Sequence, residues 1–178
     1  LEALLFQVGR YLLIASSRPG TYPANLQGTW NAYTSSPWSC GYWHNINVQM
    51  NYWPSEITNL AELFLPYADY AKAYMPLARR YGDEFVRVNY PERLSPPGEN
   101  GWTIGTGAWL YTVHGSTRVN HSGPGTGAFT SLLFWDYYDY TRDRTFLREV
   151  CYPILRDMSL FFSKALCEYD GKYLVRDS

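Results

Sequence analysis

The segment from Gly127 to Asp170, "GAFTSLLFWDYYDYTRDRTFLREVCYPILRDMSLFFSKALCEYD", decides the fold, because it has the pattern of two consecutive helices. Thr126 is a candidate N-cap for the first helix, which we expect to end near Thr141. Asp143 or Thr145 then starts the second helical stretch. The turn between them is short, so the two helices are predicted to lie antiparallel as a pair.

The second of these helices contains a proline and is followed by a glycine. Pro153 lacks a backbone N–H and should kink the helix or split it in two. Gly171 suits the left-handed position that follows a helix C-terminus. Only the short run "KYLVR" near the end of the chain has strand character, so the predicted fold class is mostly α.

Three earlier segments also have helical signals. Residues Glu2 to Ser16 place apolar side chains on one stripe at helical spacing. That stripe consists of Leu4, Leu5, Val8, Tyr11, Leu12 and Ala15. Another helix should begin near Ile46 and be interrupted near Pro54. A third should begin at Pro66, a good first helical residue, and end near Tyr81.

Two long loops, rich in glycine, proline and aromatic residues, separate these helices. They read "SRPGTYPANLQGTWNAYTSSPWSCG" and "NYPERLSPPGENGWTIGTGAWLYTVHGSTRVNHSGPGTG". Loops of this length are commonly either functional or disordered, and their tryptophans argue against disorder. Long aromatic loops on one side of antiparallel helix pairs are typical of the site-bearing end of a helical toroid.

The overall composition excludes some partners and favours others. The 178 residues carry a net charge of −1, so there is no basic field for nucleic acid or anionic lipid. Aromatic residues make up 18% of the chain, with 17 Tyr and 7 Trp, while charged residues make up 17%. Tyr and Trp suit surfaces that are apolar on one side and hydrogen-bonding at one end. Carbohydrate sites, protein interfaces and the packed loops of a helical barrel are three such surfaces.

Several other kinds of site are not predicted. Cys40, Cys151 and Cys167 do not form a disulfide framework, and no metal-binding spacing occurs, so we expect neither a metal nor a cofactor. No apolar run is long enough to cross a bilayer, and no signal peptide is recognisable. The chain does not begin with Met, which is compatible with its being part of a larger protein.

The stretch "GYWHNINVQMNYWPSEITNL", Gly41 to Leu60, concentrates carboxamides among aromatic rings. Asn45, Asn47 and Asn51 follow one another at intervals of two and four residues. Carboxamides do not titrate, so they are poor acids and bases, but they hold neutral hydroxylated groups such as a sugar or a water molecule. Alternatively, Asn45 and Asn47 are a helix cap and a buried amide that satisfies loop carbonyls.

Two segments carry a family resemblance. "RYLLIASSRPGTYPANLQGTWN" followed by "NINVQMNYWPSEITNLAEL" resembles the catalytic domain of glycoside hydrolase family 95, the α-L-fucosidases. The later "LLFWDYYDYTRDRTFLREVCYPILRDMSLFF" fits the following helix pair of that family. The resemblance covers nearly the whole chain. It is strongest where N-L-Q-G-x-W-N precedes N-x-N-x-x-M-N-Y-W-P in this order and spacing.

The resemblance implies part of an (α/α)6 toroid that removes terminal α-linked L-fucose, or L-galactose in some relatives, with inversion of configuration. It also implies a fucosylated glycan as the substrate and a secreted or cell-surface location rather than a cytoplasmic one. In the family, two asparagines that match Asn45 and Asn47 hold the attacking water. Two carbonyl oxygens near the irregular start of a helix can fix a water molecule in this way.

The family's general-acid glutamate and its water-activating aspartate match no residue of this chain. By the resemblance, residues 1–178 are the N-terminal half of the catalytic domain, and the remainder of that domain is their partner. We therefore expect the isolated chain to have no glycosidase activity.

The loops supply further candidates for substrate contact. Gln27 and Trp30 either line the cavity or lock the loop that carries them. His114 is a candidate partner for a sugar hydroxyl. Three tryptophans complete the set: Trp38, Trp102 and Trp109. Each indole either stacks on the apolar face of a sugar or packs in the local core of its own loop.

Two other classes of function remain open from the residues alone. A non-catalytic carbohydrate-binding module would use the same aromatic residues and need no acid. A protein-interaction module would explain the tyrosine content through interface burial. Titration with L-fucose separates these from the glycosidase, since a binding module should bind the sugar as it stands and a scaffold should ignore it.

Overall fold

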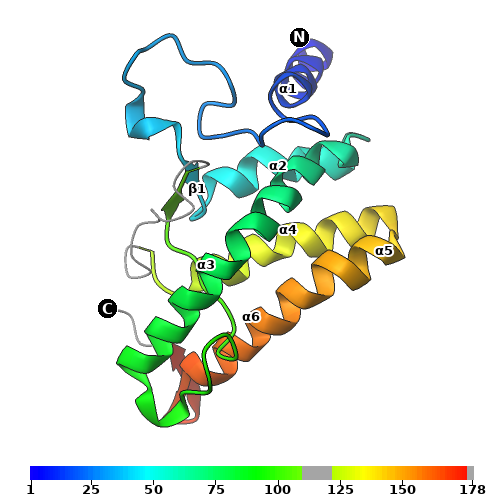
Figure 1. Cartoon of the computed structure of the whole chain (residues 1–178). Coiled ribbons are helices and arrows are strands. Elements are labelled where there is room, and N and C mark those ends of the chain that lie inside the picture. The colour runs from blue at the N-terminus through cyan, green and yellow to red at the C-terminus, as the bar shows by residue number, and fades with distance from the viewer. Residues whose placement is uncertain (110–121, 176–178) are drawn as a thin grey trace.

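The chain folds as a set of packed helices joined by long loops, in the computed structural model shown in Figure 1, which describes residues 1–109 and 122–175. The long helices are α1 (Glu2–Ser16), α2 (Asn47–Ile57), α3 (Leu65–Asn89), α4 (Gly125–Thr141) and α6 (Tyr152–Ala165). The predicted mostly-α class is confirmed, and the paired helices fit part of an (α/α) toroid.

Short elements connect the helices. The 3₁₀ turns are η1 (Pro37–Cys40), η2 (Ala61–Phe64) and η3 (Pro91–Arg93). A single turn, α5 (Arg144–Phe146), and a π-helical turn, η5 (Leu147–Cys151), precede α6. The strands are β1 (Tyr42–Trp43), β2 (Gly107–Ala108), β3 (Leu166–Tyr169) and β4 (Lys172–Val175). Strand β1 pairs antiparallel with β2, and β3 pairs antiparallel with β4.

The core lies between α2, α3, α4 and α6. Helix α4 packs against both α2 and α6, and α3 lies across α6, as Figure 1 shows. The centre is aromatic: the ring of Phe64 meets those of Tyr52, Tyr67 and Phe134 with centroids 5.2–5.8 Å apart. Aromatic pairs at these separations add to the free energy gained by burying their surface. Many of the tyrosines therefore form the core rather than a surface.

The predicted helix over Glu2–Ser16 is confirmed, but its apolar stripe is not buried by the described residues. Leu4 and Leu5 are more than 60% exposed, and Val8, Tyr11 and Leu12 are exposed as well. Leu13 and Ser16 are the buried positions of this helix. Helix α1 packs on α2 and stands apart from α3, α4 and α6 in Figure 1. It presents an apolar surface of the kind that marks an interaction site.

Helix α3 is longer than the sequence pattern predicts. It continues past Tyr81 through Gly82 to Asn89. Gly82 does not break the helix, because it serves a packing need: a Cβ at this position would lie 2.6 Å from the carbonyl oxygen of Gly101. Pro54, similarly, does not interrupt α2, which runs on to Ile57. A proline in the last turn of a helix removes only one backbone hydrogen bond.

Two predictions at helix ends are wrong and one is confirmed. Helix α4 begins at Gly125, and the Thr126 hydroxyl donates back to the Gly123 carbonyl instead of capping the helix. Asp143 does cap α5, because its Oδ1 accepts hydrogen bonds from two backbone amides of the next turn, 2.9 and 3.0 Å away. Gly171 does not end a helix. It has φ of +68° in the turn between β3 and β4.

Pro153 breaks the regular α pattern as predicted. The preceding turn, Leu147–Cys151, is π-helical, and the backbone stays helical from there into α6, so Pro153 follows a widened turn of a continuous helix and does not split it. The three cysteines are free thiols. Among the described helices, none combines the length and the apolar character needed to cross a bilayer.

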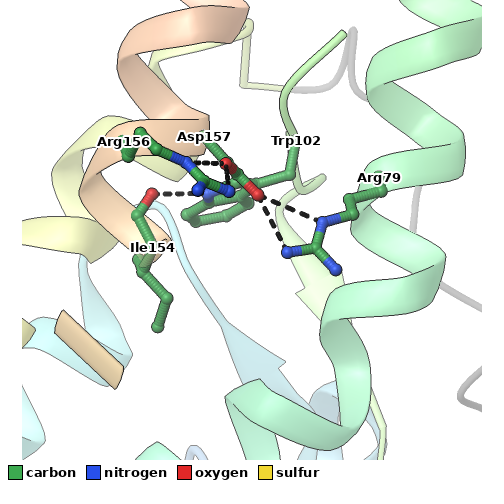
Figure 2. A network of polar contacts seen from close by, with 5 residues as sticks. All are labelled: Arg79, Trp102, Ile154, Arg156 and Asp157. Atoms are coloured by element: carbon green, nitrogen blue, oxygen red, sulfur yellow. Dashed lines mark hydrogen bonds and ion pairs between the residues drawn. The ribbon is translucent and has the colours of Figure 1, made fainter. Parts of the chain in front are cut away.

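The loop between α3 and β2 is fixed to α6 by the contacts in Figure 2. The indole N–H of Trp102 donates to the carbonyl oxygen of Ile154 over 2.9 Å. The Asp157 carboxylate accepts hydrogen bonds from Arg79 of α3 and from Arg156 of its own helix, at 2.6–3.2 Å. Because Asp157 is 5% exposed, these two guanidinium groups supply the partners that a buried carboxylate requires.

His44 is part of the core beside the start of α2. Its side chain is fully buried, and its ring centroid lies 6.1 Å from that of Tyr67. Within the described residues, neither ring nitrogen has a hydrogen-bond partner. Burial lowers the pKa of His44 to about 4, so the imidazole is neutral at pH 7.

The close approach of Gly101 to α6 yields a test of stability. Gly101 has φ of +74°, and a Cβ there would lie 2.2 Å from the Asp157 carbonyl oxygen. We expect Gly101→Ala to lower the free energy of unfolding by roughly 3 kcal/mol, since backbone strain and overpacking each cost about 1–3 kcal/mol. Gly98→Ala is the matched control, because Gly98 has φ of +86° and open space around it. It should lose only about 1–2 kcal/mol. Equal losses in a urea denaturation series would contradict the close contact.

His44 yields a second test, on the pH dependence of stability. The unfolded chain binds a proton at His44 below a pKa near 6.5, whereas the folded chain does so only near pH 4. The neutral ring therefore stabilises the fold fully above pH 6.5, and this stability is lost as the pH falls toward 4. The loss should be about 3 kcal/mol. His44→Phe should remove that part of the pH dependence in denaturation measured between pH 4 and 7.5. An unchanged slope would show that His44 is not buried in its neutral form.

Candidate functional site

Four of the sequence-predicted site residues meet at one cavity of about 440 Å³ beside the start of α2. These are Gln27, Trp38, Asn45 and Asn47. Leu26, Trp43 and Thr106 complete the lining. The residues come from the first long loop, from β1 and the start of α2, and from the segment just before β2. The cavity thus forms where two loops distant in sequence approach the first turn of one helix.

The backbone just before Asn45 is held by hydrogen bonds at both the amide and the carbonyl of His44. Strand β1 pairs with β2, and the next amide, that of His44, donates to the carbonyl oxygen of Thr106 over 2.6 Å. The buried side-chain amide of Gln49, in α2, donates through Nε2 to the His44 carbonyl oxygen and to the Thr130 hydroxyl of α4, at 2.8 and 3.0 Å. Asn45 thus follows a residue that is fixed at both its amide and its carbonyl, and α2 begins two residues later at Asn47, which limits the backbone freedom of Asn45.

Asn45 and Asn47 do not cap the helix. The N-cap position of α2 is Ile46, and no side chain caps it. Asn45 is exposed and Asn47 is half-buried, and both line the cavity. Within residues 1–109 and 122–175, neither carboxamide makes a side-chain hydrogen bond. The two amides are therefore available to a ligand or a water molecule on the cavity side.

Gln27 lies in a tight turn, and its side-chain amide is hydrogen-bonded to protein through the nitrogen but not through the oxygen. Its Nε2 donates to the carbonyl oxygen of Pro37 over 3.1 Å. Its Oε1 is buried and accepts no hydrogen bond within the described residues. Gln27 therefore links two parts of the first loop and is also one of the residues that line the cavity, although its Oε1 itself is buried.

Trp38 occupies an unusual backbone conformation at the rim of the cavity. Trp38, Ser39 and Cys40 have φ of 51°, 55° and 48°, in the left-handed region that costs energy for residues with a Cβ. The Trp38 side chain is 68% exposed. The indole N–H of Trp109 donates to the carbonyl oxygen of Ser39 over 3.2 Å, which helps to hold this turn. An exposed indole on a fixed turn is suited to stacking on a sugar ring.

Trp109 supports the cavity from behind rather than lining it. Its ring meets that of Trp43 edge to face, with centroids 6.4 Å apart. A Cβ on Gly41 would lie 2.9 Å from the Trp109 ring, so a glycine at this position makes the close packing feasible. The structure thus favours the packing alternative for Trp109.

Trp30, Trp102 and His114 do not join the described cavity. Trp30 is half exposed and lies beside Tyr11 of α1, with ring centroids 6.0 Å apart. Trp102 is 3% exposed, and Figure 2 shows its indole directed at the Ile154 carbonyl of α6. The core-packing alternative describes Trp102. His114 lies outside the described residues.

Trp43 and Thr106 line the cavity but were not among the predicted site residues. A signal existed for Trp43, because it shares the two-residue spacing of Asn45 and Asn47 in an extended segment. Its indole N–H is buried and has no acceptor within the described residues. No local signal identifies Thr106, which reaches the cavity through the pairing of β1 with β2.

The lining combines polar and apolar groups, and none of its seven described residues is charged. It combines three carboxamides, one hydroxyl and two indoles, and none of these groups ionises near neutral pH. The buried imidazole of His44 next to Asn45 is also neutral at pH 7. The described chain holds no group of three or more His, Cys, Asp and Glu residues that could bind a metal ion. Such a lining can bind and orient a hydroxylated molecule, but it cannot transfer a proton.

A family model matches the whole chain, and curated proteins match most of it. Residues 1–178 match the model of the glycosyl hydrolase family 95 catalytic domain. The chain is 38% identical over 181 residues to "Probable alpha-fucosidase A" of Aspergillus niger, covering 98% of this chain and 22% of that protein. It is 39% identical over 164 residues to "Alpha-L-fucosidase 2" of Arabidopsis thaliana, covering 90% of this chain and 18% of that protein.

A further relative is "Probable alpha-fucosidase A" of Aspergillus oryzae, which is 47% identical over 121 residues. The match covers 67% of this chain and 15% of that relative, so the chain spans about a fifth of the length of the curated proteins that it matches. The match to the family model over residues 1–178 shows that the chain belongs to the glycosyl hydrolase family 95 catalytic domain family.

Proposed function

We propose that this chain supplies part of the sugar site of an enzyme that removes terminal α-linked L-fucose from glycans with inversion of configuration. One observation carries the proposal: Asn45 and Asn47, both without side-chain partners in the described chain, face an uncharged cavity that indoles also line. The proposal agrees with the family and with the fucosidase names of its relatives.

Asn45 and Asn47 would hold the water molecule that attacks the anomeric carbon. Each side-chain carbonyl oxygen can accept one hydrogen bond from that water, which directs a lone pair toward the sugar. Because a carboxamide is a weak base, a carboxylate elsewhere must take the proton as the water attacks. The two asparagines therefore contribute position rather than proton transfer.

Trp38 and Gln27 would bind the sugar itself. The exposed indole of Trp38 offers an apolar face to the sugar ring. Gln27 would offer a hydroxyl group the second N–H of its Nε2, because its first N–H is bonded to Pro37 and its Oε1 is buried. A site that pairs each hydroxyl with a specific group discriminates strongly against a sugar that lacks the hydroxyl.

The proton donor would come from polypeptide outside the described residues. Inverting glycosidases place two carboxyl groups roughly 6.5–9.5 Å apart across the scissile bond. None of the seven lining residues carries a carboxyl group. We propose that the remainder of the catalytic domain supplies it, and that this remainder also covers the exposed apolar residues of α1.

A sugar-binding module without catalysis is the second candidate. The uncharged lining favours it, since such a module needs binding groups and no acid. The two candidates differ in what the full-length protein does: an enzyme releases L-fucose, whereas a binding module only retains it.

The water-holding role predicts a large loss of turnover. We expect Asn45→Ala or Asn47→Ala, in the full-length protein, to lower kcat by roughly 100-fold or more, as loss of one group acting in the transition state does. KM should change little. Initial rates of fucose release from a fucosylated lactose measure this. Gln7→Ala removes an exposed carboxamide of α1 as the control and should leave both constants unchanged. Normal turnover in both cavity variants would dispose of the water-holding role.

The missing acid predicts an inactive isolated chain. We expect the 178-residue polypeptide to release no L-fucose under conditions in which the full-length protein is active, because the lining has no group to protonate the leaving oxygen. Circular dichroism checks that the isolated chain is helical in the same sample. Fucose release at a rate near that of the full-length protein would mean that the described chain carries its own acid.

A further inference from the structure

The second turn of α2 holds the loop that forms the opposite side of the cavity. Asn47 begins α2 and lines the cavity. Asn51 is four residues later and so lies on the same side of the helix, one turn on. Its Nδ2 donates to the carbonyl oxygen of Asn25, 26 positions away in sequence, over 2.9 Å. One helix therefore carries a cavity residue and a clamp on the facing loop.

Tyr52 anchors the same loop with a buried relay of hydrogen bonds. The amide of Ala24 donates to the Tyr52 hydroxyl over 2.9 Å. The Ser17 hydroxyl donates its one proton to the Leu63 carbonyl oxygen over 2.8 Å. The proton between Ser17 and Tyr52, 2.9 Å apart, must therefore come from Tyr52. Every member of this relay is satisfied and buried.

Asn25 connects these clamps to Gln27. Its side-chain Oδ1 accepts a hydrogen bond from the backbone N–H of Gln27 over 2.8 Å. Its carbonyl oxygen accepts from the Gly28 amide over 2.9 Å as well as from Asn51. Gly28 has φ of +63°, which closes the turn. The turn from Asn25 to Gly28 is therefore a small unit, held to α2 at Asn25 by Asn51 and to the segment before β1 at Leu26, whose amide donates to the Gly41 carbonyl oxygen over 3.1 Å.

We propose that Asn51 is a positioning residue for the sugar site, which fixes the turn carrying Gln27 relative to Asn45 and Asn47. This inference rests on the proposed function. Tyr52 secures the loop to the core, and Asn51 is the contact that ties the turn carrying Gln27 to the same helix as Asn47. A sugar that bridges Gln27 and the asparagine pair requires this spacing, because a displacement of about 1 Å is enough to weaken a hydrogen-bonded fit.

The test separates positioning from a structural role through KM and kcat. Asn51→Asp keeps the shape and removes the donor. In the full-length protein, we expect this variant to raise KM for a fucosylated lactose by roughly three- to tenfold, the effect of losing about one hydrogen bond to the sugar. The value of kcat should stay within about twofold of wild type, since the water-holding pair is unmoved. A loss of folded protein would instead lower the apparent kcat and leave KM unchanged.

A double-mutant cycle with Gln27→Ala identifies the route of the effect. If Asn51 acts through Gln27, the variant carrying both changes should have the KM of Gln27→Ala alone. Thr58→Ala is the matched control, because its hydroxyl also bonds to a backbone carbonyl of α2, that of Pro54, at the far end of the helix. The control should leave KM unchanged.

Hydrogen exchange supplies a readout that does not depend on activity. The backbone N–H of Gln27 is protected from exchange by its hydrogen bond to Asn25 Oδ1. The backbone N–H of Gly28 is protected by its hydrogen bond to the Asn25 carbonyl oxygen. Both should exchange at least about fivefold faster in Asn51→Asp, while the Ala24 amide, bonded to Tyr52, should keep its protection.

Three results would overturn the inference: an unchanged KM, additive effects in the double-mutant cycle, or unchanged exchange at Gln27 and Gly28. A wild-type protein that neither hydrolyses nor binds an α-L-fucoside would refute the proposed function instead. In that case the exchange of the Gln27 amide alone decides whether Asn51 holds the turn.

Discussion

The arrangement of the cavity depends on one close contact, that of Gly101 with the helices on either side of it. A side chain on Gly101 would collide with the Asp157 carbonyl of α6, and a side chain on Gly82 of α3 would collide with Gly101 in turn. The loop therefore passes between α3 and α6 so closely that its backbone touches the backbone of both helices, with no room for a side chain between them. From this point it runs directly to Thr106 and β2, where it pairs with β1 and places Trp43 at the cavity.

The polar residues near the site fall into two groups, those that stabilise the fold and those that line the cavity. Tyr52, Gln49 and Asp157 are buried with hydrogen-bond partners, so they fix the loops and α6 without being open to a ligand. Asn45 and Asn47 have no such partners in the described chain, and they stand where the loops leave a cavity. A structural amide is bonded to protein, and within the described residues these two are not, which is the physical reason to assign them to a ligand.

Local patterns in the sequence predict the helices well and the cavity in part. Spacing alone leaves Asn45 and Asn47 open between a helix cap with a buried amide and a pair that holds a ligand, and the family resemblance is what favours the second. For Gln27 the sequence leaves cavity lining and loop locking open. The role of Trp102 cannot be read locally, because an indole in a long loop looks the same whether it faces a sugar or the Ile154 carbonyl of α6.

The misplaced helix ends have the same kind of cause. Gly82 has the pattern of a helix end, yet it is a site of close packing that becomes visible only together with the loop that crosses it. Likewise Leu166–Tyr169 continues the apolar pattern of α6, but it forms a strand because Lys172–Val175 folds back against it. In each case the deciding partner is distant in sequence or across a turn, and hydrophobic periodicity does not contain that information.

The π-helical turn at Leu147–Cys151 has a consequence for the angular phase of the last helix. Phe146 and Cys151 are both buried although they are five residues apart, and the buried positions after them return to spacings of three and four. Each residue of a regular α-helix turns the chain by about 100°. The π-helical turn holds one residue more than an α-helical turn and leaves the orientation of the following helix unchanged. A related chain with one residue fewer in this turn would therefore still direct Asp157 at Arg79. Length variation among relatives can thus be accommodated at this turn without disturbing the core.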